Sequence, residues 1–401
     1  LSRILGYLRD FLIAINLGSG PITDAFFVAF RIPNTFRRLF SEGTFNAAFV
    51  PSYASELKKS KKRAEQFSNQ VLNILILGLL GIVLLVELLM PFFILIIAPG
   101  FSESTAKLEL TILLTRITFP FLFFISLASF FSAILNSHNK FWLAAAVPII
   151  LNIILIFILL FIKLENDHVV IYLSYGVSIA GFIQLIILIL SVGNFMTPKI
   201  TFQFKLTNKI RSFFYKLFPS IFSSGVTQIN ILVGTIIASF QANAVSYLYY
   251  ADRIYQINLA IAGIAIGTVL LPSLSKFIQT NDQKKINFIQ NKSIELCLFL
   301  SLPATFALLI APEEITSSLF GYGSFDKLSV KNSSKALFYF ALGLPAFALI
   351  KIFSAFLFAR HNTKIPFYFS LISVIINILI SILFFKNVGF IIIPIATSIS
   401  S

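Results

Sequence analysis

Charged residues and cysteine are scarce in this sequence. Only 12% of the 401 residues are Asp, Glu, Lys or Arg, whereas 57% are hydrophobic, and the mean hydropathy is +0.91. Soluble domains carry roughly 25% charged residues, so this composition excludes an ordinary soluble globule. The single cysteine, Cys297, excludes a disulfide framework and a cysteine-rich metal site.

Sequence motifs of catalysis are also missing. The chain contains no P-loop, GxSxG or HExxH pattern. The three histidines, His138, His168 and His361, fall between apolar runs, where we expect them to be exposed to water. We therefore expect no catalytic residue, no metal site and no cofactor, and a transporter rather than an enzyme.

Long apolar runs are what the sequence has in abundance. A helix needs about 20 apolar residues to cross the roughly 30 Å hydrocarbon core of a bilayer, and the repeated runs predict an all-α polytopic membrane protein. The GxxxG motif Gly263–Gly267 predicts close helix packing within the chain. The expected helices lie near residues 2–18, 24–55, 70–98, 107–135, 141–162, 169–192, 212–240, 243–275, 286–311, 335–359, 366–385 and from 388 onward.

Basic residues gather in every second gap between these helices. The formal net charge is +15, and a basic excess in short gaps indicates topology, because cytoplasmic loops of membrane proteins are enriched in Lys and Arg. Nucleic acid is therefore not an expected partner, and the amino terminus is expected in the cytoplasm. Lys327, Lys331 and Lys335 depart from the pattern, because they fall in a gap expected on the outer side. The basic gaps contain Lys58, Lys59, Lys61, Lys62, Arg63, Lys199, Lys205, Lys209, Arg211, Lys276, Lys284, Lys285, Arg360 and Lys364.

The second half of the chain repeats the first. FSAILNSHNK from Phe131 resembles FSAFLFARHNTK from Phe353, and AFRI from Ala29 resembles ADRI from Ala251, both at an offset of 222 residues. The offset spans six expected helices, so the halves share one orientation. We therefore expect two six-helix lobes related by a pseudo-two-fold axis along the membrane normal, with a central cavity between them. An ancient duplication in a protein that transports nothing is the alternative. The expected lobes are residues 1–205 and 206–401.

Several charged residues interrupt segments that are otherwise apolar, mostly in the first two expected helices. A central arginine costs about 2.5–3.5 kcal/mol on insertion scales, so these side chains must face water, protein or an anion. The cluster consists of the arginines Arg3, Arg9, Arg31, Arg37, Arg38 and Arg253 and the acids Asp10, Asp24, Glu42 and Asp252.

The arginines of this cluster outnumber the acids. Arg31 and Arg38 are seven residues apart and share a helix face, whereas Asp10 adjoins Arg9 on another face and is expected to neutralise an arginine of another helix. Two interpretations stay open: buried ion pairs that hold helices together, and a cationic cavity for phosphate or pyrophosphate, which the planar guanidinium suits. The excess of positive charge favours the cavity.

Several sequence blocks point to a known family. Those of the first half are SRILGYLRD from Ser2, TDAFFVAF from Thr23, Pro33-Asn34, Arg37-Arg38, Glu42-Gly43 and AFVP from Ala48. Those of the second half are YYADRI from Tyr249 and GTVLLPSLS from Gly267. Over essentially its whole length the chain resembles the MurJ (MviN) family of lipid II flippases, within the multidrug and polysaccharide exporter superfamily.

The resemblance implies two six-helix lobes around a cationic cavity, followed by two further helices that this fragment lacks. It also implies that the protein moves lipid II, the undecaprenyl-pyrophosphate-linked peptidoglycan precursor, from the cytoplasmic to the periplasmic leaflet of the bacterial cytoplasmic membrane by alternating access. The expected partners are then lipid II, the bilayer and the cell-wall synthesis machinery. The alternatives are an exporter of drugs or of another polyprenyl-linked oligosaccharide, and a non-transporting scaffold of that machinery.

The resemblance also assigns roles to residues. The family's substrate-binding arginines fall on Arg3, Arg9, Arg37 and Arg253, and its essential acid falls on Asp24. Some members have a sodium-binding acid where this chain appears to have Gly234, so membrane potential is the expected driving force. Roles in cavity charge or gating are expected for Asp10, Asp24, Arg31, Asn34, Arg38, Glu42 and Asp252.

Overall fold

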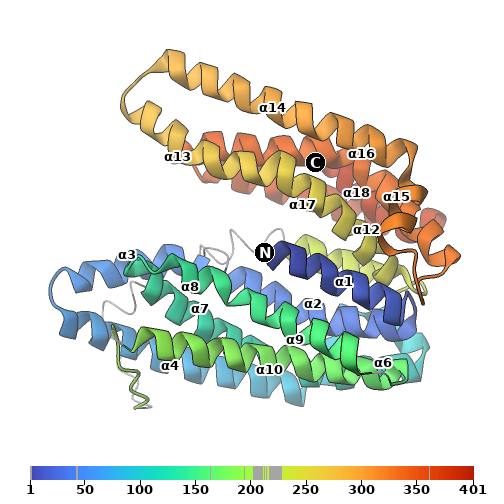
Figure 1. Cartoon of the computed structure of the whole chain (residues 1–401), viewed down its shortest axis with the longest axis horizontal. Helices are drawn as coiled ribbons and strands as arrows, with labels where there is room; N and C mark the ends of the chain where they lie inside the picture. The colour runs from blue at the N-terminus through green and yellow to red at the C-terminus, as the bar shows by residue number, and fades with distance from the viewer. Residues whose placement is uncertain are drawn as a thin grey trace. The chain divides into compact units, whose positions relative to one another are not determined.

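In the part of the protein that a computed structural model describes, helices joined by loops make up the fold, and there is no strand (Figure 1). The described residues are 2–41, 44–162, 164–193, 195–201, 211, 213, 215, 228–360 and 362–401. The sequence-based prediction of an all-α fold is therefore confirmed.

The helices of the first half include long spans and short segments. They are α1 (Ser2–Leu17), α2 (Pro21–Ser41), α3 (Thr44–Leu57), α4 (Lys61–Leu88), α5 (Met90–Ile97), the 3-10 helix η1 (Pro99–Glu103), α6 (Thr105–Thr118), α7 (Phe121–Ser137), α8 (Phe141–Ala146), α9 (Pro148–Phe161) and α10 (Asn166–Val192).

The second half begins, in the described residues, with a short apolar helix at Gln228–Ala238. It continues with α12 (Ala244–Leu259), the π-helix η2 (Ala260–Ala265), α13 (Ile266–Gln279), α14 (Gln283–Ile310), α15 (Pro312–Phe320), α16 (Lys327–Ala359), α17 (Lys364–Val388), the 3-10 helix η3 (Gly389–Ile391) and α18 (Ile392–Ser400).

The chain forms two compact units. Unit 1 contains residues 1–13 and 21–228, and unit 2 contains residues 14–20 and 229–401. The carboxyl-terminal end of α1 thus belongs to unit 2. The predicted lobe boundaries, 1–205 and 206–401, stay a prediction.

Eight helical segments of the described residues are long and apolar enough to cross a membrane. They account for nine of the expected helices, because residues 364–400 form one such segment where two helices were expected. The expected helix at 2–18 is α1, whose 16 residues include three charges. The expected helix at 24–55 corresponds to α2 and α3, and that at 212–240 is described only from Gln228.

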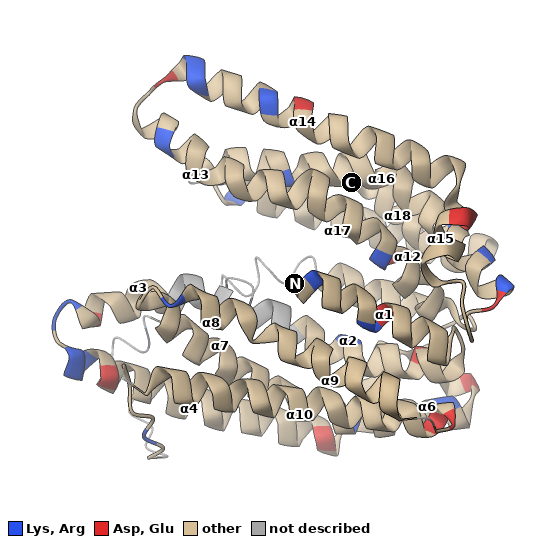
Figure 2. Ribbon diagram, viewed as in Figure 1, with Lys and Arg blue, Asp and Glu red and all other residues tan. Residues whose placement is uncertain are grey.

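The outer surfaces of the long helices are apolar. Large side chains such as Leu84 and Leu88 on α4, Phe299 on α14 and Leu383 on α17 are 62–79% exposed, whereas Figure 2 shows Lys, Arg, Asp and Glu mainly toward helix ends. Apolar side chains exposed over whole helices are stable in hydrocarbon and not in water. This surface is that of a multi-pass membrane protein.

A proline inside α2 frees one backbone carbonyl, and a neighbouring helix satisfies it. Pro33 has no N–H to donate to the carbonyl of Ala29 four residues earlier. The Thr118 hydroxyl of α6 donates to that carbonyl at 3.1 Å. In an environment without water this contact replaces the lost helical hydrogen bond, so it fixes α6 against the charged helix α2.

The GxxxG motif packs within unit 2, as predicted. A β-carbon on Gly263 would lie 3.0 Å from the Ala348 Cα of α16, and one on Gly267 would lie 3.4 Å from the Lys351 carbonyl oxygen. Glycine at these positions allows η2 and α13 to approach the α16 backbone closely, most tightly at Gly263. The π-helix at this contact was not predicted from the sequence.

Candidate functional site

Arg9 and Asp10 of α1 form a buried ion pair in unit 1. The Arg9 Nη2 and Nε atoms donate to Asp10 Oδ1 at 2.7 and 3.0 Å, and the two residues are 6% and 2% exposed. The expectation that Asp10 lies on another face from Arg9 and does not pair with it was wrong, whereas its neutralising an arginine of another helix stays a prediction. Adjacent β-carbons do diverge on a helix, but the long arginine side chain folds back and reaches the neighbouring carboxylate.

Two other helices hold the Arg9 guanidinium in place. Its Nη1 atom donates to the Asn152 side-chain oxygen of α9 at 3.0 Å, and its central carbon lies 5.3 Å from the centre of the Phe30 ring of α2. Asn152 in turn donates to the Ser2 carbonyl at 3.2 Å. The guanidinium therefore has a fixed orientation at the contact of α1, α2 and α9.

Asp24 and Lys107 form a second buried pair in unit 1. Asp24 lies in the first turn of α2 and Lys107 in the first turn of α6. Lys107 Nζ donates to Asp24 Oδ2 at 2.8 Å, and the Asp24 side chain is 0% exposed and that of Lys107 10%. The ammonium also lies 3.8 Å from the centre of the Phe101 ring. Sequence analysis missed Lys107, although a lysine at the start of an apolar helix was a visible signal.

Arg253 and Asp252 lie half-buried on α12 of unit 2. The Arg253 Nη2 atom donates to the Tyr249 hydroxyl at 2.9 Å, and its central carbon lies 4.6 Å from the centre of the same ring. Asp252 accepts a hydrogen bond from the Gln256 side-chain amide. Tyrosine thus supports Arg253 one helical turn away, a role that the sequence motif did not reveal.

The other predicted site residues lie in α1 and α2 or outside the described part. Arg3 is exposed near the start of α1, and Arg31 and Asn34 are half-buried on either side of Pro33. The side chains of Arg37, Arg38 and Glu42 lie outside the described residues.

The structure therefore brings some of the predicted residues together within unit 1. Arg9 and Asp10 share one buried site, and Asp24 has a buried partner of its own. A cavity that joins these residues to Arg253 would require both units, and it stays a prediction.

The expectation for His138 was wrong, because this histidine is partly buried at the carboxyl-terminal end of α7. Its Nε2 atom is hydrogen-bonded to the Tyr53 hydroxyl at 3.1 Å, and its ring stacks on Phe195 at 4.1 Å between centres. Burial first, and the charge of Lys61 second, lower the pKa of His138 below its ordinary value. His168 is exposed as predicted, and His361 lies outside the described residues.

The sequence matches a family model over most of its length. The model described as "Lipid II flippase MurJ" matches residues 13–401. The chain belongs to the MurJ family. The sequence blocks that begin at Thr23 and Tyr249 lie inside the matched range, so the family resemblance predicted from them is confirmed.

Curated MurJ relatives are similar along nearly the entire chain. "Probable lipid II flippase MurJ" of Rhizobium meliloti (strain 1021) is 41% identical over 399 residues, which cover 97% of this chain and 74% of the relative. The protein of the same name from Rickettsia prowazekii (strain Madrid E) is 39% identical over 409 residues, covering 100% of this chain and 79% of the relative.

Solved structures agree with this family assignment. A structure described as "Lipid II flippase MurJ, inward closed conformation" has a TM-score of 0.89 and 31% identity, covering 100% of this chain and 83% of that one. An inward-facing transporter of the multidrug resistance MATE family has a TM-score of 0.79 at 14% identity, covering 100% and 91%. The second likeness shows the fold alone, which MurJ and MATE transporters share.

Proposed function

We propose that this chain is a transporter that moves lipid II from the cytoplasmic to the periplasmic leaflet of the bacterial cytoplasmic membrane by alternating access. Membership of the MurJ family supports the substrate, and the apolar outer surfaces of both units support the location in a bilayer. The positive-inside pattern supports an amino terminus in the cytoplasm.

The observation that carries the proposal is the fixed, buried guanidinium of Arg9. A guanidinium has five N–H donors, and Arg9 uses three of them on Asp10 and Asn152. The other two have no partner among the described residues, so they are available to phosphate oxygens. Because its neighbours already set the orientation of Arg9, a pyrophosphate would bind without the cost of ordering a long side chain.

We assign the pyrophosphate of lipid II to Arg3, Arg9, Arg37 and Arg253. Arg9 is neutralised by Asp10 in this structure, so the net attraction for the anion comes from the other three arginines, with Arg9 supplying directed donors. Asp24, paired with Lys107, acts in cavity charge or gating. The same roles are proposed for Asp10, Arg31, Asn34, Arg38, Glu42 and Asp252.

Lipid II binding to the purified protein tests the proposal. We expect Arg9→Ala and Arg253→Ala each to raise the Kd for lipid II about tenfold or more, because each removes charge-assisted hydrogen bonds to phosphate. Binding of the unsubstituted protein should weaken at high salt. Arg360→Ala, which removes an exposed arginine at the end of α16, is the matched control and should bind normally.

Growth of cells depleted of their native flippase separates transport from scaffolding. Arg253→Ala should insert into the membrane but fail to restore growth, whereas Arg360→Ala should restore it. A protein that restores growth without binding lipid II would be a scaffold, and this result would overturn the proposal. Tighter binding of a different undecaprenyl-pyrophosphate glycan would instead identify an exporter of that glycan.

A further inference from the structure

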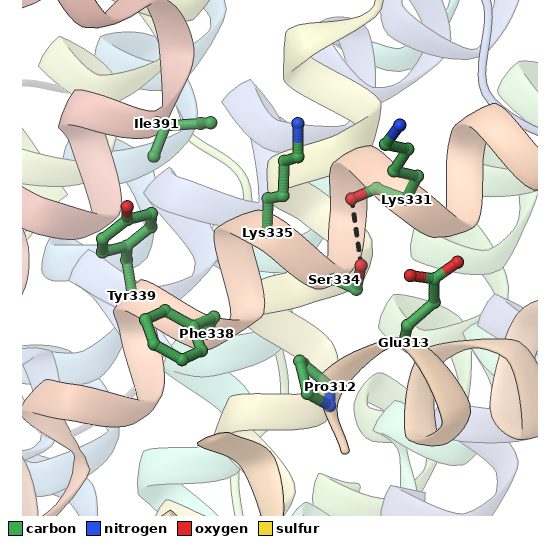
Figure 3. A pocket seen from close by; sticks show the side chains of 8 residues that line it. All are labelled: Pro312, Glu313, Lys331, Ser334, Lys335, Phe338, Tyr339 and Ile391. Carbon is green, nitrogen blue, oxygen red and sulfur yellow. Dashed lines mark hydrogen bonds between the residues drawn. The ribbon is translucent and has the colours of Figure 1, made fainter. Parts of the chain in front are cut away.

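A cavity of about 420 Å³ lies within unit 2, at the contact of α15, α16 and η3. Figure 3 shows the side chains of Lys331 and Lys335 pointing the same way from α16, Phe338 and Tyr339 further along that helix, and Glu313 on the neighbouring helix α15. The residues that line this cavity are Pro312, Glu313, Lys331, Ser334, Lys335, Phe338, Tyr339 and Ile391.

The lysines of this cavity are placed where helix physics disfavours them. Lys327, Lys331 and Lys335 follow one another at intervals of four in the first turns of α16. Like charges four residues apart repel each other, and Lys327, in the first turn, also opposes the helix dipole. Lys331 and Lys335 are exposed and form no ion pair with a described residue. Lysines that repel one another and form no ion pair with a described residue indicate a role in binding.

The lysines also depart from the charge pattern of the whole chain. Ser324, three residues before α16, donates its backbone N–H to the Ile15 carbonyl at 2.8 Å and its hydroxyl to the Asn16 carbonyl at 3.0 Å. The start of α16 therefore lies beside the carboxyl-terminal end of α1. With the proposed cytoplasmic amino terminus, this end of unit 2 faces the outer side, where Lys and Arg are normally depleted.

The cavity combines the features that a phosphate-bearing headgroup requires. Two ammonium groups four residues apart on one helix face can contact the same phosphate. Phe338, Ile391 and Pro312 form an apolar wall for the part of a lipid next to its headgroup. Tyr339 adds an aromatic ring with a polar end, which suits the boundary between hydrocarbon and water. The volume lies within the range of small-molecule sites.

We propose that this cavity binds an anionic phosphate group, supplied by the headgroup of an anionic phospholipid in the outer leaflet. Lys331 and Lys335 contact the phosphate oxygens. Glu313 lowers the net charge of the lining and so limits the affinity. None of the arginines assigned to the pyrophosphate of lipid II lines this cavity, so the site can exist whether or not that assignment is correct.

Titration of the purified full chain with short-chain phosphatidylglycerol, followed by native mass spectrometry, tests the site. The double variant Lys331→Gln/Lys335→Gln should weaken binding about tenfold. Glu313→Gln should strengthen it about threefold, a gain that a merely structural role would not produce. The matched control is Lys276→Gln/Lys284→Gln, which removes two exposed lysines elsewhere in unit 2 and should bind as the unsubstituted protein does.

Inorganic phosphate and short-chain phosphatidylcholine identify the source of the phosphate. If inorganic phosphate competes at the same concentration as the lipid, the cavity is a phosphate site whose ligand is free phosphate. If inorganic phosphate competes weakly and phosphatidylcholine binds weakly, the ligand is the anionic phospholipid. Equal binding by the Lys331→Gln/Lys335→Gln variant, or equal weakening in the control, would overturn the proposal. Because both lysines are exposed, the variants should keep their melting temperature, and lipid II binding of the same samples reports separately on the proposed function.

Discussion

The buried charged residues of unit 1 form ion pairs with residues at very different distances along the chain. Arg9 pairs with its immediate neighbour Asp10, whereas Asp24 pairs with Lys107, 83 positions away. Both pairs are largely removed from water, where an ion without its partner is far more costly than at a surface. Each pair therefore links the charge of the predicted site to the stability of the unit that holds it.

Removal of the lysine partner of Asp24 should be strongly destabilising. We expect Lys107→Met to lower the free energy of unfolding by about 3 kcal/mol, because it leaves a fully buried carboxylate without its cation. The double variant Asp24→Asn/Lys107→Met should recover most of this loss, since neither charge remains. Thermal denaturation of the purified protein in detergent measures both effects.

An exposed ion pair provides the control for this experiment. Lys285 and Asp282 lie 3.0 Å apart with side chains 62% and 32% exposed, and surface pairs contribute about 0–1 kcal/mol. Lys285→Met should therefore change the melting temperature little. A Lys107→Met protein as stable as the unsubstituted one would show that Asp24 does not depend on this lysine.

At the scale of helices, aromatic side chains join α3 to α7. Phe49 of α3 lies 5.2 Å from the Phe130 ring of α7, and one turn later the Tyr53 hydroxyl reaches His138 after the end of α7. His138 then stacks on Phe195, beyond the end of α10. Three helices thus meet around a single titratable ring.

The lowered pKa of His138 makes this contact sensitive to pH. Its folded-state pKa lies below the unfolded-state value of about 6.5, so the unfolded chain binds more protons between the two values. Stability is fully present above about pH 6.5 and is lost as the pH falls toward the folded-state pKa. We expect a small decrease in melting temperature between pH 7.5 and pH 5.5, because the ring is only partly buried.

Histidine variants isolate this effect. His138→Gln should reduce the pH-dependent part of the melting temperature, whereas His168→Gln, which replaces an exposed histidine at the start of α10, should leave the profile unchanged. Identical pH profiles for His138→Gln and the unsubstituted protein would refute the assignment.

For the whole molecule, we expect the excess of arginines to couple the proposed transport to membrane potential. An inside-negative potential drives an anionic lipid outward and draws an empty cationic site inward, so both halves of a cycle are favoured. Gly234 has no carboxylate for sodium, and a β-carbon there would lie 3.5 Å from the apolar side chain of Ile393. Potential is therefore the driving force that these residues support.

Flipping of lipid II in liposomes should respond to potential and not to sodium. A potential of 100 mV contributes about 2.3 kcal/mol for each charge moved, which corresponds to at most about a 50-fold change in rate. The same liposomes without a potential are the control, and replacement of sodium by choline should leave the rate unchanged. A rate that follows sodium and ignores potential would contradict this prediction.

The helical membrane architecture, the GxxxG packing and the family were all predictable from the sequence. Each depends on a local pattern: the length of an apolar run, the spacing of two glycines or the order of residues in a motif such as YYADRI from Tyr249. Hydropathy requires no knowledge of neighbouring helices, because hydrocarbon acts on each run separately.

The pairing of charges and the position of cavities could not be predicted in this way, because both depend on how the helices pack. The partners of Asp24 and His138 are distant in sequence, and the partner of Arg9 depends on how its side chain folds back. The cavity around Lys331 and Lys335 requires α15 and η3 beside α16. Contacts of this kind arise from packing between helices, which a hydrophobic pattern along one helix does not specify.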